Sequence, residues 1–196
     1  MNIYKTFPTL ENDKYILRPV LDADLDNLLK VYSDVKAVPL FNSDNCHGDN
    51  FYYTTKARMK KALDFWKQAY DNGWFVRFGI VDKKSGEAIG TIEEFHREEK
   101  DYFTNCGLLR LDLRSDYEKA TEIYSILSLI SVPSFDLFGC DIVATKAIPS
   151  AVERIKALTD TGFTLSHEPL IGHDGTKYYD YYVLKKDNYT TASVIV

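Results

Sequence analysis

The chain has 196 residues and a net charge of −5, from 29 acidic and 24 basic side chains. This length favours one domain over residues 1–196, and 45 % hydrophobic residues suffice for a core. No basic run suggests a nucleic-acid partner, and no apolar segment is long enough for a signal peptide or a membrane span. We therefore expect a globular cytoplasmic protein.

The cysteines and aromatic residues narrow the class further. Cys46, Cys106 and Cys140 are odd in number and widely spaced, which is typical of reduced thiols rather than of a disulfide frame or a zinc site. No metal site is therefore expected. The aromatic content of 14 % argues against disorder and favours aromatic-lined clefts.

The first part of the chain predicts a strand, a helix and a long loop. Residues 15–19 have the pattern of a strand that its proline ends. Asp22 or Asp24 is expected to cap a helix that carries apolar residues as far as Tyr32. Residues 36–55 are loop-like but carry four aromatic side chains. They form either a lid over a substrate or a loop that its rings pin to the body.

The next segment predicts a helix and two strands. Residues 55–70 have apolar side chains at helical spacing. Strands are expected at 74–81 and 88–95, and the second carries Glu93 and Glu94 side by side. Because successive side chains of a strand point to opposite faces, at most one of these two carboxylates can face a cleft.

Residues 109–131 change from strand periodicity to helix periodicity. Leucines alternate with charged residues over 109–113, and apolar residues recur at helical spacing from Ile123. Between these patterns, Ser115 and Glu118 fit an S-x-x-E capping box. A strand that runs into a helix start directs free N–H groups at one point in space, which is a natural anion site.

The following segment predicts a bent helix, a strand and another helix. Pro133 is expected to bend the helix, and Gly139 to end it. A short buried strand is expected at 141–146. A second capping box, formed by Ser150 and Glu153, is expected to start the next helix.

The C-terminal part predicts further strands. They are expected at 163–165 and 178–184, with a turn at 172–175 between them, and 194–196 could add an edge strand. The tyrosines of 178–182 either pack as a ladder or line an acceptor site. The order β-α-α-β-β-β-α-β-α-β-β predicts a mixed α/β sheet with helices on both faces.

This order, together with four local matches, resembles the GCN5-related N-acetyltransferase (GNAT) superfamily, in its RimJ/RimL-like branch of ribosomal-protein N-terminal acetyltransferases. The matches, which span residues 7–185, are Phe7-Pro8-Thr9-Leu10 with Tyr15-Ile16-Leu17-Arg18-Pro19 and Asp22-Ala23-Asp24-Leu25, then Ala88-Ile89-Gly90-Thr91-Ile92, then Ala120-Thr121-Glu122, and finally Ala151 through Gly162-Phe163. The resemblance implies an α+β fold with a mostly antiparallel central sheet. It also implies an N-acetyltransferase that transfers an acetyl group from acetyl-CoA to a primary amine of a small molecule or a protein N-terminus.

The cofactor loop departs from the family pattern. The family binds the acetyl-CoA pyrophosphate through backbone N–H groups of a [QR]-x-x-G-x-[GA] loop. Ser115, Glu118 and Ala120 fall on the three key positions, and only the alanine fits, although the neighbouring Arg114 could partly replace the Gln/Arg. Glycine lets phosphate approach the backbone, whereas Glu118 adds a like charge there. The segment is either a self-capped helix start or a retained cofactor loop, and we expect weak acetyl-CoA binding or none.

The resemblance also implies a set of site residues. The backbone of 111–113 would hold the acetyl carbonyl and the pantetheine, and the family's Asn and Ser fall on Ala151 and Arg154. The implied cofactor-binding residues are Leu111, Asp112, Leu113, Arg114, Ser115, Tyr117, Glu118, Lys119, Ala120, Ala151 and Arg154. Glu93 or Glu94 is the candidate catalytic base, and His96 is either a proton relay or a surface residue.

Three interpretations stay open. The first is an N-acetyltransferase whose partners are acetyl-CoA and an amine acceptor, without nucleic acid or membrane; a homodimer is compatible with it. The second is a degenerate member of the fold that binds a partner without efficient acetyl-CoA turnover. The third, weaker one is an enzyme that uses another acyl donor. The net charge of −5 favours a cationic acceptor.

Overall fold

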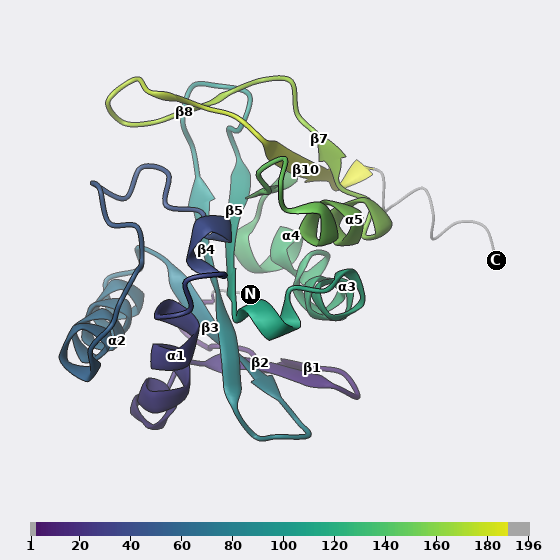
Figure 1. The fold of residues 1–196 in the computed structure, drawn as a ribbon. Coiled ribbons are helices and arrows are strands. Elements are labelled where there is room, and N and C mark those ends of the chain that lie inside the picture. Colours follow the sequence, from purple (N-terminus) through teal and green to yellow (C-terminus); the bar gives the residue numbers. More distant parts are fainter. Residues whose placement is uncertain (1–2, 188–196) are drawn as a thin grey trace.

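The computed structural model describes residues 3–187, which are built around one eight-stranded sheet in the order β1-β2-β3-β4-β5-β6-β10-β7 (Figure 1). Neighbouring strands are antiparallel except β5 and β6, which are parallel. The strands of this sheet are β1 (Leu10–Glu11), β2 (Tyr15–Pro19), β3 (Val76–Asp82), β4 (Ala88–Arg97), β5 (Cys106–Leu113), β6 (Ile142–Lys146), β7 (Thr164–Leu165) and β10 (Tyr181–Lys185). A separate hairpin is formed by β8 (Leu170–Ile171) and β9 (Lys177–Tyr178).

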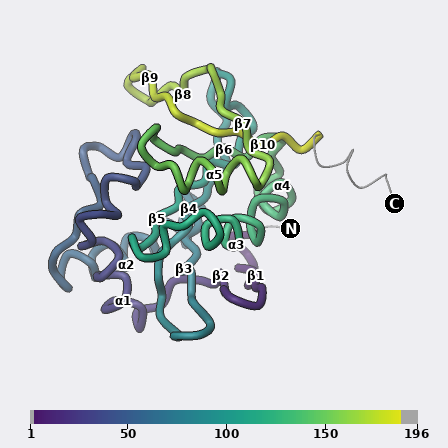
Figure 2. Tube along the Cα trace, turned by 45° about the vertical axis from the view of Figure 1, so that its right-hand side comes forward, coloured from purple at the N-terminus to yellow at the C-terminus, as the bar shows by residue number. Residues whose placement is uncertain are grey.

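Helices cover both faces of the sheet, as the sequence predicts (Figures 1 and 2). One face carries α1 (Leu25–Tyr32) and α2 (Lys56–Asp71), which pack on β4 and β3. The other face carries α3 (Ala120–Ile130), α4 (Pro133–Phe138) and α5 (Val152–Asp160). Within residues 3–187, none of the helices combines the length and the apolar character that a membrane span needs.

The buried apolar residues form three clusters, one of which packs between the sheet and the helices α3 and α4. The leucines of β5 that alternate with charged residues, Leu109, Leu111 and Leu113, are buried with α3 and α4. The intervening Arg110 and Asp112 therefore point to the face that α1 and α2 cover. A polar layer thus lies between the sheet and α1, and it forms the floor of the site described below.

The two expected capping boxes are not formed. Ser115–Tyr117 make a 3-10 turn, and α3 begins only at Ala120, with Lys119 as its N-cap residue. The Glu118 carboxylate turns away from the helix start and pairs with Arg154. A charged partner from another segment thus replaces the local hydrogen bond that the S-x-x-E pattern predicts.

The second box is replaced in the same way. Helix α5 has Ala151 as its N-cap residue, with no side-chain cap. The Glu153 carboxylate instead accepts a hydrogen bond from the backbone N–H of Ala120, at 2.8 Å. The segments around 118–120 and 153–154 therefore provide each other's ion-pair and hydrogen-bond partners.

Other sequence expectations need smaller corrections. Pro133 does not bend one helix but begins a separate one, α4, which Gly139 ends with a φ of 64°. The Asp24 side chain does not cap α1, because it forms a bidentate ion pair with Arg18 at 2.8 Å. The edge strand expected at 194–196 lies outside the described residues.

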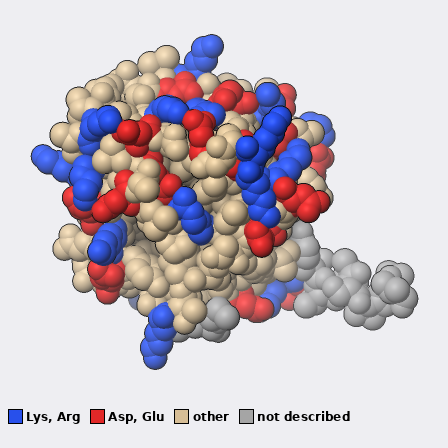
Figure 3. Space-filling model, turned by 90° about the horizontal axis from the view of Figure 1, so that it is seen from below, with Lys and Arg blue, Asp and Glu red and all other residues tan. Residues whose placement is uncertain are grey.

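The surface carries both signs of charge. On the face seen in Figure 3, Lys and Arg side chains lie between Asp and Glu side chains. The ion pairs of the surface include Lys14 with Glu122, at 3.2 Å. Opposite charges at this spacing compensate each other locally.

Candidate functional site

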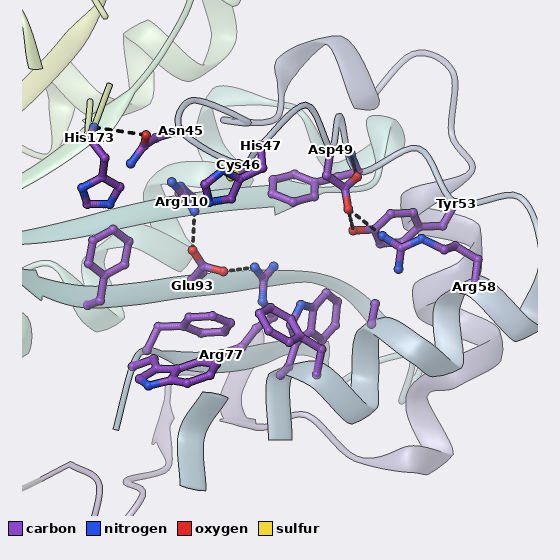
Figure 4. A pocket seen from close by; sticks show the side chains of 17 residues that line it. Asn45, Cys46, His47, Asp49, Tyr53, Arg58, Arg77, Glu93, Arg110 and His173 are labelled. Atoms are coloured by element: carbon purple, nitrogen blue, oxygen red, sulfur yellow. Dashed lines mark hydrogen bonds and ion pairs between the residues drawn. The ribbon is translucent and has the colours of Figure 1, made fainter. Parts of the chain in front are cut away.

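A pocket of about 400 Å³ opens over β4 and β5 on the face that carries α1 and α2 (Figure 4). Its walls come from α2, the start of β3 and the 45–58 segment, and one rim comes from the β8–β9 turn. Seven aromatic rings line it: Phe51, Tyr53, Phe65, Trp66, Trp74, Phe75 and Phe95. We call this space the acceptor pocket.

The long loop is pinned to the body by its rings, one of the two alternatives that the sequence left open, and it also lines the pocket. Phe41, Phe51 and Tyr53 are buried and attach the loop to α1 and α2. Phe51 and Tyr53 also line the acceptor pocket. The loop is therefore pinned to the body and forms a wall of the pocket.

Glu93 lies at the floor of the acceptor pocket between two arginines (Figure 4). Its Oε2 accepts from Arg77 Nη2, and its Oε1 accepts from Arg110 Nη1 at 2.6 Å. Burial disfavours the charge of Glu93, but the two guanidinium groups outweigh it and hold the pKa of the carboxyl below its ordinary value. Glu93 is therefore ionised at neutral pH.

Arg77 connects Glu93 to a buried polar layer beneath the pocket. Its Nη1 donates to the hydroxyls of Tyr32 and Thr91, at 2.9 and 3.0 Å, and to the Asp112 carboxylate at 3.1 Å. The Tyr32 hydroxyl also donates to Asp112, at 2.7 Å. Burial raises the pKa of Asp112, although Arg77 opposes this shift. The Asp112 side chain therefore belongs to the buried polar layer under α1.

Glu94 lies on the opposite face of the sheet. One of its oxygens accepts from the Ser134 hydroxyl of α4 at 2.9 Å, and the other has no partner among the described residues. Burial raises the pKa of Glu94 to about 8, although the hydrogen bond from Ser134 opposes the shift. Of the two candidate bases, only Glu93 lines the acceptor pocket, as strand alternation requires.

Five backbone N–H groups of the 115–120 loop, where pyrophosphate was expected to bind, already have partners. The N–H of Ser115 donates to the Asp34 carboxylate at 2.9 Å, and that of Ala120 donates to Glu153 at 2.8 Å. The N–H groups of residues 117–119 donate to backbone carbonyls of the same turn. Burial opposes the charge of Asp34, but hydrogen bonds from Ser115 and nearby backbone N–H groups hold its pKa below the ordinary value. A carboxylate therefore accepts a backbone hydrogen bond at each end of this loop.

An arginine side chain occupies the space beside β5 where the pantetheine was expected. Strand β6 pairs with β5 only as far as Leu109 and Thr145. Beyond that point the carbonyl of Leu111 accepts from Arg154 Nη1, at 2.9 Å. The same Nη1 donates to the Leu40 carbonyl at 2.9 Å. We call this space the donor slot.

The Arg154 guanidinium is also ion-paired. Its Nη2 and Nε donate to the two carboxylate oxygens of Glu118, and Arg154 is only 2 % exposed. With the Leu111 carbonyl and these five loop N–H groups taken, the donor side in this arrangement leaves acetyl-CoA few backbone partners. The carboxylates of Asp34 and Glu153 would also repel a pyrophosphate.

The other predicted cofactor residues are paired, buried or exposed away from the donor slot contacts described above. Arg114 pairs with Glu87 and Asp116, and the Tyr117 hydroxyl donates to Asp82 at 2.8 Å. Lys119 is exposed, whereas Leu113 and Ala151 are buried. His96 is exposed and bonds to Asn105, away from the acceptor pocket.

Sequence reasoning missed the two arginines of the pocket floor. Arg77 lies between Val76 and Phe78 in β3, and Arg110 lies between Leu109 and Leu111 in β5. A charged residue between apolar neighbours in a buried strand indicates a buried ion pair. Within residues 3–187, no cluster of His, Cys, Asp and Glu has the makings of a metal site.

Several solved structures of acetyltransferases have the same fold. The ribosomal-protein-S5-alanine acetyltransferase of Vibrio fischeri matches with a TM-score of 0.65 and 18 % identity, covering 92 % of this chain and 98 % of that one. RimJ of Mycobacterium smegmatis, in complex with CoA-disulfide, matches with a TM-score of 0.68 and 13 % identity, covering 92 % and 87 %. A GCN5-related N-acetyltransferase of Brucella melitensis matches with 0.67 and 13 %, covering 93 % and 80 %. A scan against family models and a search of curated proteins found no match. The chain thus has the GNAT fold.

Proposed function

We propose that this chain is an N-acetyltransferase that acetylates a primary amine bound in the acceptor pocket. The observation that carries the proposal is Glu93, an ionised carboxylate at the floor of an aromatic pocket in a fold shared with acetyltransferases. Acetyl-CoA is the proposed donor, bound weakly because the donor slot is filled by the chain itself. We also propose that the protein is cytoplasmic.

The lining of the pocket supports an amine on an apolar or aromatic body. Aromatic faces attract cations, and an arginine guanidinium already lies over four of the seven rings: Tyr53, Trp66, Phe75 and Phe95. Among the remaining rings of the pocket, Trp74 is the most exposed, at 55 %. It is therefore the ring we propose to contact the acceptor.

Glu93 suits orientation of the amine better than proton abstraction. A carboxyl whose pKa is held below its ordinary value accepts a proton less readily. We propose that Glu93, whose charge is balanced by Arg77 and Arg110, orients the acceptor by accepting a hydrogen bond from its amine. His47 and His173 line the same pocket and are the proposed proton acceptors.

A second candidate function is ligand binding without acetyl transfer. The closed donor slot favours it, because Arg154 already occupies the Leu111 carbonyl. In this case the acceptor pocket would bind an amine for recognition only.

The test is an acetylation assay with acetyl-CoA and a panel of arylalkylamines, aliphatic polyamines and peptides with free N-termini, read by mass spectrometry. We expect arylalkylamines to be the best acceptors. Trp74→Ala should raise their KM by about tenfold, since contact with an aromatic ring contributes ~1 kcal/mol or more. The exposed ring Tyr124, on α3, provides the matched control Tyr124→Ala. Binding of amines by calorimetry without any acetylated product would favour the second candidate.

A further inference from the structure

We infer that the Arg154–Glu118 pair closes the donor slot, so that an acyl-CoA thioester binds only when Arg154 leaves the Leu111 carbonyl. The inference rests on the proposed function for the identity of the ligand. It assigns to Arg154 the control of donor affinity, whereas the resemblance places it simply among the cofactor-binding residues.

The contacts of Arg154 are those of a side chain held in one place. Its guanidinium bonds to the carbonyls of Leu40 and Leu111 and to both oxygens of Glu118. The side chains of Arg154 and Glu118 are only 3 % and 8 % exposed. Breaking a bidentate ion pair that is this deeply buried costs free energy. Arg154 therefore competes directly with any ligand amide that donates to Leu111.

The pair also explains two separate departures from the family pattern. Glu118 stands where the family has a glycine, and Arg154 stands where it has a serine. The two positions are 36 residues apart in the chain, yet their side chains meet. One interaction thus accounts for both changes, and it lies where the ligand would lie.

Two further carboxylates support the same closed arrangement. Asp34 accepts from the N–H of Ser115, and Glu153 accepts from the N–H of Ala120. These carboxylates fill the role of a bound anion at a helix start. A pyrophosphate would have to displace both of them, in addition to the displacement of Arg154 by the pantetheine.

The experiment is a calorimetric titration of CoA and of acetyl-CoA into the wild type, Arg154→Ala and the double variant Arg154→Ala/Glu118→Gly. Arg154→Ala alone leaves the buried Glu118 carboxylate without its partner and could fold poorly for that reason. The double variant removes this carboxylate as well. Lys156→Ala is the matched control, because it removes the same charge from an exposed position of the same helix. Circular dichroism melting checks that each variant is folded.

We expect CoA to bind the double variant at least about tenfold more tightly than the wild type, which corresponds to about 1.4 kcal/mol. Arg154→Ala removes a positive charge, which by itself should weaken the binding of an anion, and the double variant removes both charges of the ion pair and leaves the net charge unchanged. A gain in affinity therefore cannot come from net charge, and Lys156→Ala should show no gain.

The inference fails if the wild type binds CoA as tightly as the folded double variant, or if neither binds. The acetylation assay separates this result from the proposed function. If the wild type binds CoA tightly and acetylates amines, the inference that Arg154 closes the donor slot is wrong and the proposed function is supported. A double variant that gains CoA binding but acetylates no amine would keep the closed slot and count against the function.

Discussion

Glu93 and Glu94 are neighbours in β4, yet their carboxyl groups lie on opposite faces of the sheet in opposite electrostatic environments. Two guanidinium groups hold the pKa of Glu93 below its ordinary value, whereas burial raises the pKa of Glu94 to about 8. At neutral pH the first is ionised and the second is protonated. Strand alternation therefore gives two identical side chains different charges, and this difference can be measured.

The first prediction concerns Glu94 and the pH dependence of stability. Between the ordinary value of 4.5 and about 8, the unfolded chain releases this proton and the folded chain keeps it. The stabilisation is fully present below the lower value and is lost as pH rises to the upper one, by up to about 1.4 kcal/mol per pH unit. Glu94→Gln does not titrate, so its free energy of unfolding should rise relative to the wild type from pH 5 to pH 8. Urea unfolding at several pH values measures this difference.

The amide of the variant adds N–H donors that need partners, but this offset is the same at every pH. Glu98→Gln, at an exposed position, is the control and should follow the wild type. A difference between Glu94→Gln and the wild type that stays constant across this range would show that Glu94 does not keep its proton.

The second prediction concerns the ion pairs of Glu93. Glu93→Gln leaves Arg77 and Arg110 in a buried site without their common carboxylate. Loss of one partner from a buried pair costs about 3–5 kcal/mol, because a desolvated charge remains. Urea unfolding at pH 7 should show this loss. Asp49→Asn, which breaks the exposed pair with Arg58 in the same pocket, should cost about 1 kcal/mol or less. Equal losses for the two variants would contradict the buried-pair interpretation.

The third prediction concerns the polar layer beneath the pocket. Tyr32→Phe removes the hydroxyl that donates to Asp112 at 2.7 Å and accepts from Arg77 at 2.9 Å. We expect a loss of about 1–3 kcal/mol, because the buried Asp112 oxygen keeps only its longer bond to Arg77. Thermal unfolding by calorimetry measures it. Tyr124→Phe, on an exposed ring, should change the melting temperature very little.

The sheet and its helices were predictable because their signals are local. Each segment by itself shows apolar residues at the spacing of a strand, two residues, or of a helix, 3.6 residues. The alternating leucines of 109–113, for example, lie together on one face of β5, in the core. The prediction of the two capping boxes was wrong because the partners of their glutamates are distant in the chain. Glu118 and Glu153 have partners in each other's neighbourhood, Arg154 and the N–H of Ala120, and no pattern within either segment contains that information.

The acceptor pocket was only partly predictable. The Glu93–Glu94 pair and the aromatic loop were visible in the sequence, and both contribute to the pocket or flank it. The arginines were not recognised, because a charge in a strand identifies its partner only when register is known. Arg77 lies opposite Glu93 in the β3–β4 register, and Glu93 lies opposite Arg110 in the β4–β5 register. Three adjacent strands thus place the three side chains in one row.

The last prediction tests the contact between the two helix starts. Glu153 accepts from the N–H of Ala120, so it caps α3 from a different helix. Glu153→Ala should lower the free energy of unfolding by about 1 kcal/mol, the usual contribution of a side-chain cap. Urea unfolding measures the loss, with Glu98→Ala as the exposed control. The same variant frees an N–H group of the donor loop and removes a negative charge. Its CoA affinity should therefore rise while its stability falls, and a fall in both would show that Glu153 supports the loop rather than competing for it.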